Sequence, residues 1–131
     1  MKTRTIDQTV VIPAKPQEVY DAWIDPEEHS AMTGGAAGGE AKVGGEFLAW
    51  DGYITGTYLE LVPGKKIVCD WQTSEWPEGA EPSRLELTFT PKDDGTEIHL
   101  IHSNIPPHDA DYETGWHQSY WEPMREYFSS R

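Results

Sequence analysis

The chain has 131 residues, which suits one domain with one hydrophobic core, so we expect residues 1–131 to form a single domain. Its 23 acidic and 10 basic residues give a net charge of −13, which argues against nucleic acid and anionic membranes as partners, because both attract basic surfaces. The single cysteine excludes an internal disulfide, and no apolar run approaches the roughly 20 residues that span a bilayer.

The first quarter of the chain predicts one strand followed by helix. Residues 5–12 are rich in β-branched side chains, which is typical of a strand. Residues 16–24 carry apolar side chains at helical spacing and begin with a proline, which suits the first helical turn. Pro26 ends or kinks this helix, and residues 26–32 can form a second short helical turn. The N-terminal residues contain no apolar segment of the signal-peptide kind, so we expect a cytoplasmic protein.

The middle of the chain predicts short antiparallel strands joined by tight turns. The strands expected here lie near residues 36–41, 45–50, 53–62 and 66–73. The alternation of apolar residues in the third of them is imperfect, and a bulge near Gly56 would reconcile it. A polar loop over 74–82 holds Trp76, an aromatic side chain that we expect to be exposed. It would either gate a cavity mouth or pack on the prolines of its own loop.

The last third predicts a β-hairpin and a strongly aromatic terminal helix. Residues 83–90 and 95–103 alternate between apolar and polar side chains, and the segment between them carries a hairpin-turn signal. Pro123 should kink the terminal helix and divide it into 109–121 and 124–130. One strand, one or two helices, about six strands and a last helix indicate an α+β protein, with helices packed on one face of a curved antiparallel sheet.

Several segments resemble one known family. They are Val19–Pro26, Gly56–Pro63, Lys66–Trp71, Leu100–Ser103, Gly115–Trp116 and Tyr120–Trp121. In this order they resemble the activator of heat-shock protein 90 ATPase homologue-like proteins of the START-like (SRPBCC) superfamily. The resemblance implies a helix-grip fold, in which six to seven strands wrap around a long C-terminal helix and leave an apolar cavity. It says less about activity, because one fold can host many functions.

Strand parity predicts which side chains face such a cavity, because alternate residues of a strand point to opposite faces. His99 and His102 therefore lie on opposite faces of the last strand and cannot bind one metal ion together. The residues expected to line the cavity from the sheet are Cys69, Trp71, Leu85, Leu87, Phe89, Leu100 and His102, and those from the helix are Trp116, Tyr120 and Met124.

Two ionisable residues, Glu113 and His117, also fall on the aromatic face of the terminal helix at about 100° per residue. With His102 they form the one group of side chains that could take part in chemistry, and they could hold the polar end of a ligand. The preferred alternative is that His102 is hydrogen-bonded to core backbone, and that Glu113 and His117 lie at the solvent edge. Cys69 is expected to be a small buried hydrophobic residue. We assign no catalytic residue, no metal site and no cofactor.

These observations favour a binding protein for an apolar or aromatic small molecule. One alternative, implied by the resemblance, is an interaction module that acts on a heat-shock chaperone ATPase in the stress response. A second alternative is a cyclase- or hydrolase-like enzyme that uses a cavity histidine. A large empty cavity would favour the first or third function, whereas a core filled by aromatic side chains would favour the second. An exposed sheet edge would allow a homodimer.

Overall fold

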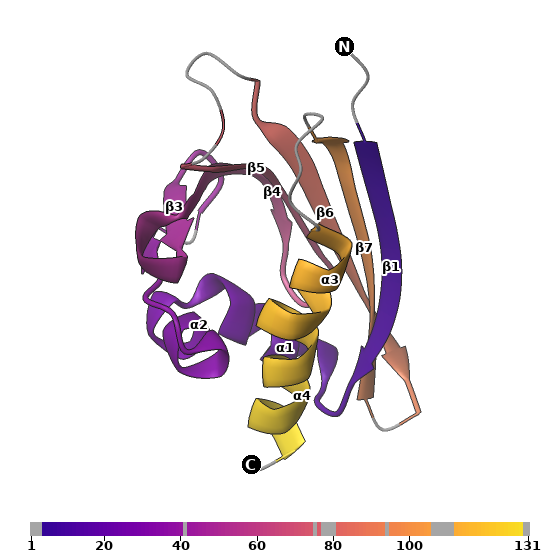
Figure 1. Ribbon diagram of the computed structural model, residues 1–131. Coiled ribbons are helices and arrows are strands. Elements are labelled where there is room, and N and C mark those ends of the chain that lie inside the picture. Colours follow the sequence, from indigo (N-terminus) through magenta and orange to yellow (C-terminus); the bar gives the residue numbers. More distant parts are fainter. Residues whose placement is uncertain are drawn as a thin grey trace.

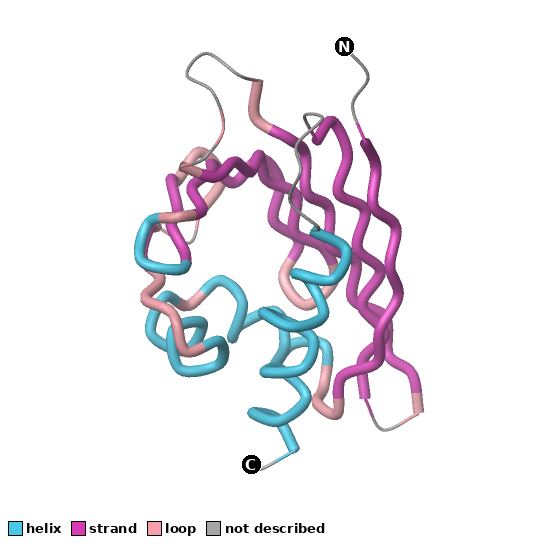
Figure 2. The backbone as a smooth tube through the Cα atoms, viewed as in Figure 1, coloured by secondary structure: helices cyan, strands magenta, loops and turns pink. Residues whose placement is uncertain are grey.

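The computed structural model describes residues 4–40, 42–74, 76, 81–93, 95–105 and 112–129. Within these ranges an antiparallel sheet curves around a C-terminal helix, and two short helices close the same concave side (Figure 1). Figure 2 shows the strands as one layer and the helices as the second. The predicted α+β helix-grip architecture is confirmed. In the described part of the chain no helix is long and apolar enough to cross a bilayer.

The sheet has seven strands in the order β1-β7-β6-β5-β4-β3-β2. The strands are β1 (Arg4–Ile12), β2 (Gly38–Gly39), β3 (Glu46–Ala49), β4 (Ile54–Val62), β5 (Lys66–Thr73), β6 (Ser83–Lys92) and β7 (Gly95–Ile105). Among the described residues, strands β2 to β7 follow one another as neighbours, and β1 pairs only with β7. The first strand of the chain therefore joins the last one, at an edge of the sheet.

Three strands differ from the sequence prediction. The strand expected near residues 36–41 is reduced to the two residues of β2 within the described part of the chain. The strand expected over 45–50 ends at Ala49, because Trp50 and Asp51 adopt left-handed backbone angles in the short 3-10 turn η1 (Trp50–Gly52). The bulge in β4 lies between Tyr58 and Glu60 rather than at Gly56. Gly56 serves close packing instead, since a Cβ atom there would lie 2.6 Å from the ring of Phe47.

The two helices after β1 have the predicted boundaries and local causes. Helix α1 (Pro16–Ile24) begins with its proline, and helix α2 (Pro26–Thr33) begins at Pro26. The side chain of Asp25 caps α2 by accepting a 3.0 Å hydrogen bond from the backbone N–H of Glu27. Helix α2 ends at Gly34, which has a φ of 87° that favours glycine.

The C-terminal helix runs through its proline by widening one turn. It consists of α3 (Tyr112–Trp116), the π-helical turn η2 (His117–Trp121) and α4 (Glu122–Ser129). The backbone N–H of Glu122 bonds to the carbonyl of His117, five residues back. Pro123 has no N–H to donate to the carbonyl of residue 119, and its ring would crowd that carbonyl in a regular helix. A π turn is one of the known ways to relieve this, so the predicted division at Pro123 is replaced by a continuous helix with one wide turn.

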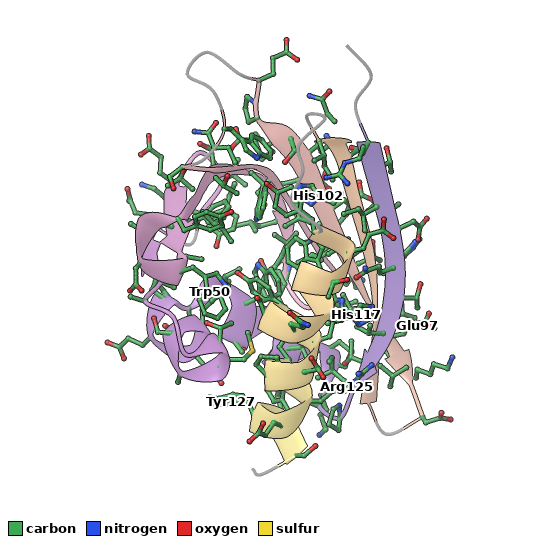
Figure 3. All side chains as sticks on the ribbon, in the orientation of Figure 1. Trp50, Glu97, His102, His117, Arg125 and Tyr127 are labelled. Carbon is green, nitrogen blue, oxygen red and sulfur yellow. The ribbon has the colours of Figure 1, made fainter. Side chains whose placement is uncertain are left out.

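This wide turn also corrects the predicted face of the helix. One extra residue in the turn moves the buried face by one position. The buried residues are therefore Tyr112, Trp116, Tyr120, Trp121, Met124 and Phe128. Glu113 and His117 are exposed, so the prediction that they share the aromatic face is wrong. Figure 3 shows His117 on the side of the helix that faces away from the interior. The predicted helix residues 109–111 and 130 lie outside the described residues.

The predicted strand parity is confirmed in β5, β6 and β7. Their inward side chains form the core together with helices α1 and α4, and each is at most 4% exposed. These residues are Ile67, Cys69, Trp71, Leu85, Leu87, Phe89, Ile98, Leu100 and His102. His99 lies on the opposite face of β7, where its Nε2 is 2.8 Å from the Asp7 carboxylate. The two histidines are therefore on opposite faces of the sheet, as predicted.

Candidate functional site

A cavity of about 370 Å³ lies between the C-terminal helix and the end of the sheet near η1. It is lined by Trp50, Tyr53, Ile54, Trp71, Tyr112, Gly115, Trp116, Ser119 and Tyr120. The side chains of Ile54, Trp71, Tyr112, Trp116 and Tyr120 are buried, whereas Trp50, Tyr53, Gly115 and Ser119 are half-buried. The cavity therefore has a buried aromatic floor and a half-exposed rim.

The deeper space between sheet and helix is filled by stacked rings. The Trp23 and Tyr120 rings lie 4.9 Å apart at an interplanar angle of 27°, and the Trp116 and Trp121 rings lie 5.8 Å apart at 22°. Such offset pairs add stability beyond their burial. A residual space of about 20 Å³ beneath them holds roughly one water molecule and no ligand. The interior is thus closed in its deep half and open in the half near η1.

The structure brings together three of the residues predicted to bind a ligand. Trp71, Trp116 and Tyr120 line the cavity. Cys69 and Leu85 border only the small residual space. Leu87, Phe89, Leu100 and Met124 are buried in the core without lining either space. The other six lining residues were not predicted to bind a ligand, because the left-handed turn at Trp50 and the wide helical turn have no periodic signal in the sequence. They are Trp50, Tyr53, Ile54, Tyr112, Gly115 and Ser119.

His102 is bound into a buried chain of hydrogen bonds. Its Nδ1 accepts from the indole N–H of Trp116 at 3.3 Å, and its Nε2 lies 2.7 Å from the hydroxyl of Ser83. That hydroxyl donates to the backbone carbonyl of Trp71 at 2.6 Å, so it accepts the proton of Nε2. Burial, and secondarily the charge of Arg4, lower the pKa of His102 to about 3. The imidazole is therefore neutral, and its hydrogen bond through Ser83 to backbone matches the preferred structural interpretation.

A second buried histidine, His29, was not singled out from the sequence. Its Nδ1 donates to the carbonyl of Trp23 at 2.8 Å, and its Nε2 lies 3.2 Å from the hydroxyl of Tyr120. Burial lowers the pKa of His29, so it is neutral and its Nε2 accepts the Tyr120 proton. This bond fixes the position of the Tyr120 ring, which forms part of the cavity floor.

Trp76 is buried, with 8% of its surface exposed, so the prediction of an exposed aromatic residue is wrong. Its indole N–H donates to the hydroxyl of Tyr112 at 2.9 Å, and its ring packs edge-on against Trp71 at 5.7 Å. Trp76 therefore supports two residues of the cavity wall from behind. Of the loop prolines considered as its packing partners, only Pro82 lies within the described residues.

Cys69 is 1% exposed, and burial followed by the nearby charge of Asp70 raises the pKa of its thiol. The thiol is therefore protonated and packed as a small apolar group, in agreement with its predicted role. A nucleophilic thiolate would need the opposite environment.

No charged side chain lines the cavity among the described residues. In the same part of the chain no three His, Cys, Asp or Glu side chains come close enough together to hold a metal ion. The cavity polar groups are hydroxyls and indole N–H groups. The arrangement can therefore bind aromatic or apolar surface and form neutral hydrogen bonds.

This fold and this cavity define a helix-grip protein of the START-like kind. Two solved structures share the fold over nearly their whole length. An HSP90 activator from Plasmodium falciparum matches with a TM-score of 0.86 and 24% identity, over 95% of this chain and 96% of that one. The protein Ara h 8.0201 matches with a TM-score of 0.76 and 12% identity, over 99% of this chain and 100% of that one.

The family model described as "Activator of Hsp90 ATPase homolog 1-like protein" matches residues 13–129, and the chain belongs to this family. The mouse activator of 90 kDa heat shock protein ATPase homolog 1 is 35% identical over 114 residues, which make up 86% of this chain. This chain spans about a third of that relative, since the match covers 33% of it. The family predicted from the sequence segments is thus confirmed.

Proposed function

We propose that the protein binds a small apolar or aromatic molecule in the cavity between the sheet and the C-terminal helix. The observation that carries this proposal is a space of about 370 Å³ in which six of the nine lining residues are aromatic. Its volume falls within the ~300–1,000 Å³ typical of small-molecule sites, and its lining has the expected mixture of aromatic rings and a few polar groups. Burying ligand surface there contributes about 25 cal/mol per Å².

An acid–base enzyme built on a cavity histidine has less support. His102 does not line the cavity, and both of its ring nitrogens are occupied by hydrogen bonds. His117, the other histidine considered, is exposed on the helix. A general base must reach the proton that it removes and accept it near neutral pH. Neither histidine meets both conditions.

Native mass spectrometry of freshly purified protein tests the binding proposal. A bound molecule should appear as an added mass that is lost on denaturation. Ser119→Phe would fill the cavity from η2 and should abolish the added mass, whereas Gln118→Phe, on the exposed side of the same turn, should leave it unchanged. The proposal is wrong if the protein carries nothing and its Tm also ignores a panel of fatty acids, sterols and flavonoids. The same spectra report whether the protein forms the homodimer that an exposed sheet edge would allow.

A second candidate function is an interaction with an Hsp90-type chaperone. The observation that favours it is the 35% identity with a named activator of the 90 kDa heat shock protein ATPase. Because this chain corresponds to a third of that protein, the activity of the whole relative is a proposal here. Adding the purified protein to an Hsp90 ATPase assay tests it. If Ser119→Phe changes the ATPase rate as the wild type does, chaperone binding does not depend on the cavity.

A further inference from the structure

Trp50 stands out among the cavity residues because its backbone is strained. Its φ is 53°, and the next residue, Asp51, has a φ of 59°. The left-handed region disfavours large L side chains, so both residues are strained. Strain of this kind persists only where the surrounding structure enforces it. The position of this indole is therefore a specific feature of the fold.

The loop after α2 is shaped to receive the Trp50 ring. A Cβ atom on Gly35 would lie 2.8 Å from Cδ2 of Trp50, so only glycine allows the ring this close to the backbone. The backbone N–H of Asp51 bonds to the carbonyl of Ala36 at 3.0 Å and ties the strained turn to the same loop. On its other side the ring meets Tyr120 edge-on at 6.3 Å. Figure 3 shows Trp50 directed from this end of the molecule toward the C-terminal helix.

The indole N–H of Trp50 is shielded from solvent and makes no hydrogen bond. This N–H lies close to the Tyr120 hydroxyl but outside hydrogen-bond geometry. Burial raises the pKa of Tyr120, and the nearby Trp50 N–H offsets part of that rise. The Tyr120 proton is already donated to His29. A buried donor without a partner is unfavourable, because it has lost its hydrogen bond to water. A ligand acceptor that reaches this N–H from the cavity would remove this cost.

The cavity also selects against charge. No Asp, Glu, Lys, Arg or His is among its described lining residues. Arg4, whose guanidinium lies 5.8 Å from the centre of the Tyr112 ring, is not part of the lining. A carboxylate or ammonium in this space would lose hydration without gaining a group of opposite charge, which is unfavourable. The lining also includes a hydroxyl donor on the helix, that of Ser119.

We propose that the ligand is an uncharged, planar aromatic molecule with a hydrogen-bond acceptor such as a carbonyl oxygen, and that the Trp50 indole N–H donates to that acceptor. The aromatic walls formed by Trp71 and Trp116 favour flat rings, which stack or meet them edge-on. The volume of about 370 Å³ is large enough for two or three fused rings. This inference rests on the binding function proposed above.

Three probes with the same tricyclic frame test it: fluorenone, which has one carbonyl acceptor; fluorene, which has none; and fluorene-9-carboxylate, which is charged. Equilibrium dialysis measures their dissociation constants. For the wild type we expect fluorenone to bind about tenfold more tightly than fluorene, because one additional hydrogen bond is formed. The carboxylate should bind at least about tenfold more weakly than fluorenone.

Trp50→Phe should reduce the difference between fluorenone and fluorene to about twofold or less and leave fluorene binding in place, because the ring is kept and the donor is lost. Trp121→Phe is the matched control, since its indole N–H donates to Gln8 at 2.8 Å, away from the cavity. This control should keep the wild-type preference for fluorenone. Circular dichroism confirms that both variants fold.

Each contrary result is informative. Equal binding of fluorenone and fluorene to the wild type, or a preference that survives Trp50→Phe, overturns the role of Trp50 while the binding function stands. Tightest binding of the carboxylate overturns the uncharged class and would implicate Arg4. If none of the three probes binds, this inference is wrong; if native mass spectrometry also finds no ligand, the proposed function fails as well.

Discussion

Ser83 connects His102 to the backbone of β5, and its removal should destabilise the protein measurably. Ser83→Ala removes the hydrogen-bond partner of the His102 Nε2–H and of one lone pair of the Trp71 carbonyl. Ser83 and His102 are each at most 1% exposed, so water cannot replace the lost hydroxyl. An unsatisfied buried donor costs about 1–3 kcal/mol, and the carbonyl adds a smaller amount because it has a second lone pair. We expect the free energy of unfolding to fall by about 2–3 kcal/mol.

This loss translates into a shift of Tm. At about 2.1 cal/mol/K per residue, the unfolding entropy of a 131-residue chain is about 0.28 kcal/mol/K, so Tm should fall by about 7–11 °C. Urea unfolding followed by tryptophan fluorescence measures the free energy, and calorimetry measures Tm. Ser103→Ala is the matched control: this serine lies half-buried on β7, and its side chain makes no hydrogen bond within the described residues. Its effect should stay within about 0.5 kcal/mol. If Ser83→Ala is equally mild, the His102 network does not stabilise the fold.

Three further predictions concern single groups. The pKa of His102 is lowered to about 3 in the fold, so the unfolded chain takes up the extra proton first as the pH falls. The free energy of unfolding is therefore full above pH 6.5 and should fall by about 2 kcal/mol by pH 5. His102→Leu should reduce this loss, as measured by urea titrations at both pH values. Gly35→Ala should destabilise the protein by about 1–3 kcal/mol, because the new methyl group meets Trp50. Gly115→Ala should stabilise it by about 0.5–1 kcal/mol, because this glycine lies in a helix with open space at its Cβ. Chemical denaturation measures both changes in the free energy of unfolding, and changes of the same sign would contradict the packing argument. Buried Cys69 should not react with Ellman's reagent at pH 8 in native protein and should release one equivalent in guanidinium; fast native reaction would contradict its burial.

Local patterns predicted most of the fold correctly. The alternation of residues 83–90 placed Leu85, Leu87 and Phe89 inward, and all three are buried. The prolines at 16 and 26 marked the starts of α1 and α2 because their fixed φ suits a first helical turn. These predictions succeeded because each depends on geometry that repeats within a few residues of the chain.

The candidate site was predicted only in part, because its position depends on two irregular turns. A regular helix at 100° per residue placed Glu113 and His117 inward, but the π turn before Pro123 moves the buried face by one residue and leaves both exposed. The left-handed turn at Trp50 ends β3 early and brings the indole to the cavity. Neither turn has a periodic signal. Pro123 marks an irregularity in the helix but does not specify a π turn, and the turn at Trp50 is tied to the loop after α2 by the hydrogen bond from Asp51 to Ala36.

By itself, the sequence determined the family, the helix-grip architecture and the inward faces of β5, β6 and β7, because periodicity and segment order are local properties. Only the tertiary structure decided how the interior space is divided. Rings from α1 and the C-terminal helix fill its deep half, while η1 and the wide helical turn leave the other half open. It also decided that His102 is a satisfied structural group, because its partners Ser83 and Trp116 come from different elements that meet only when the sheet closes around the helix.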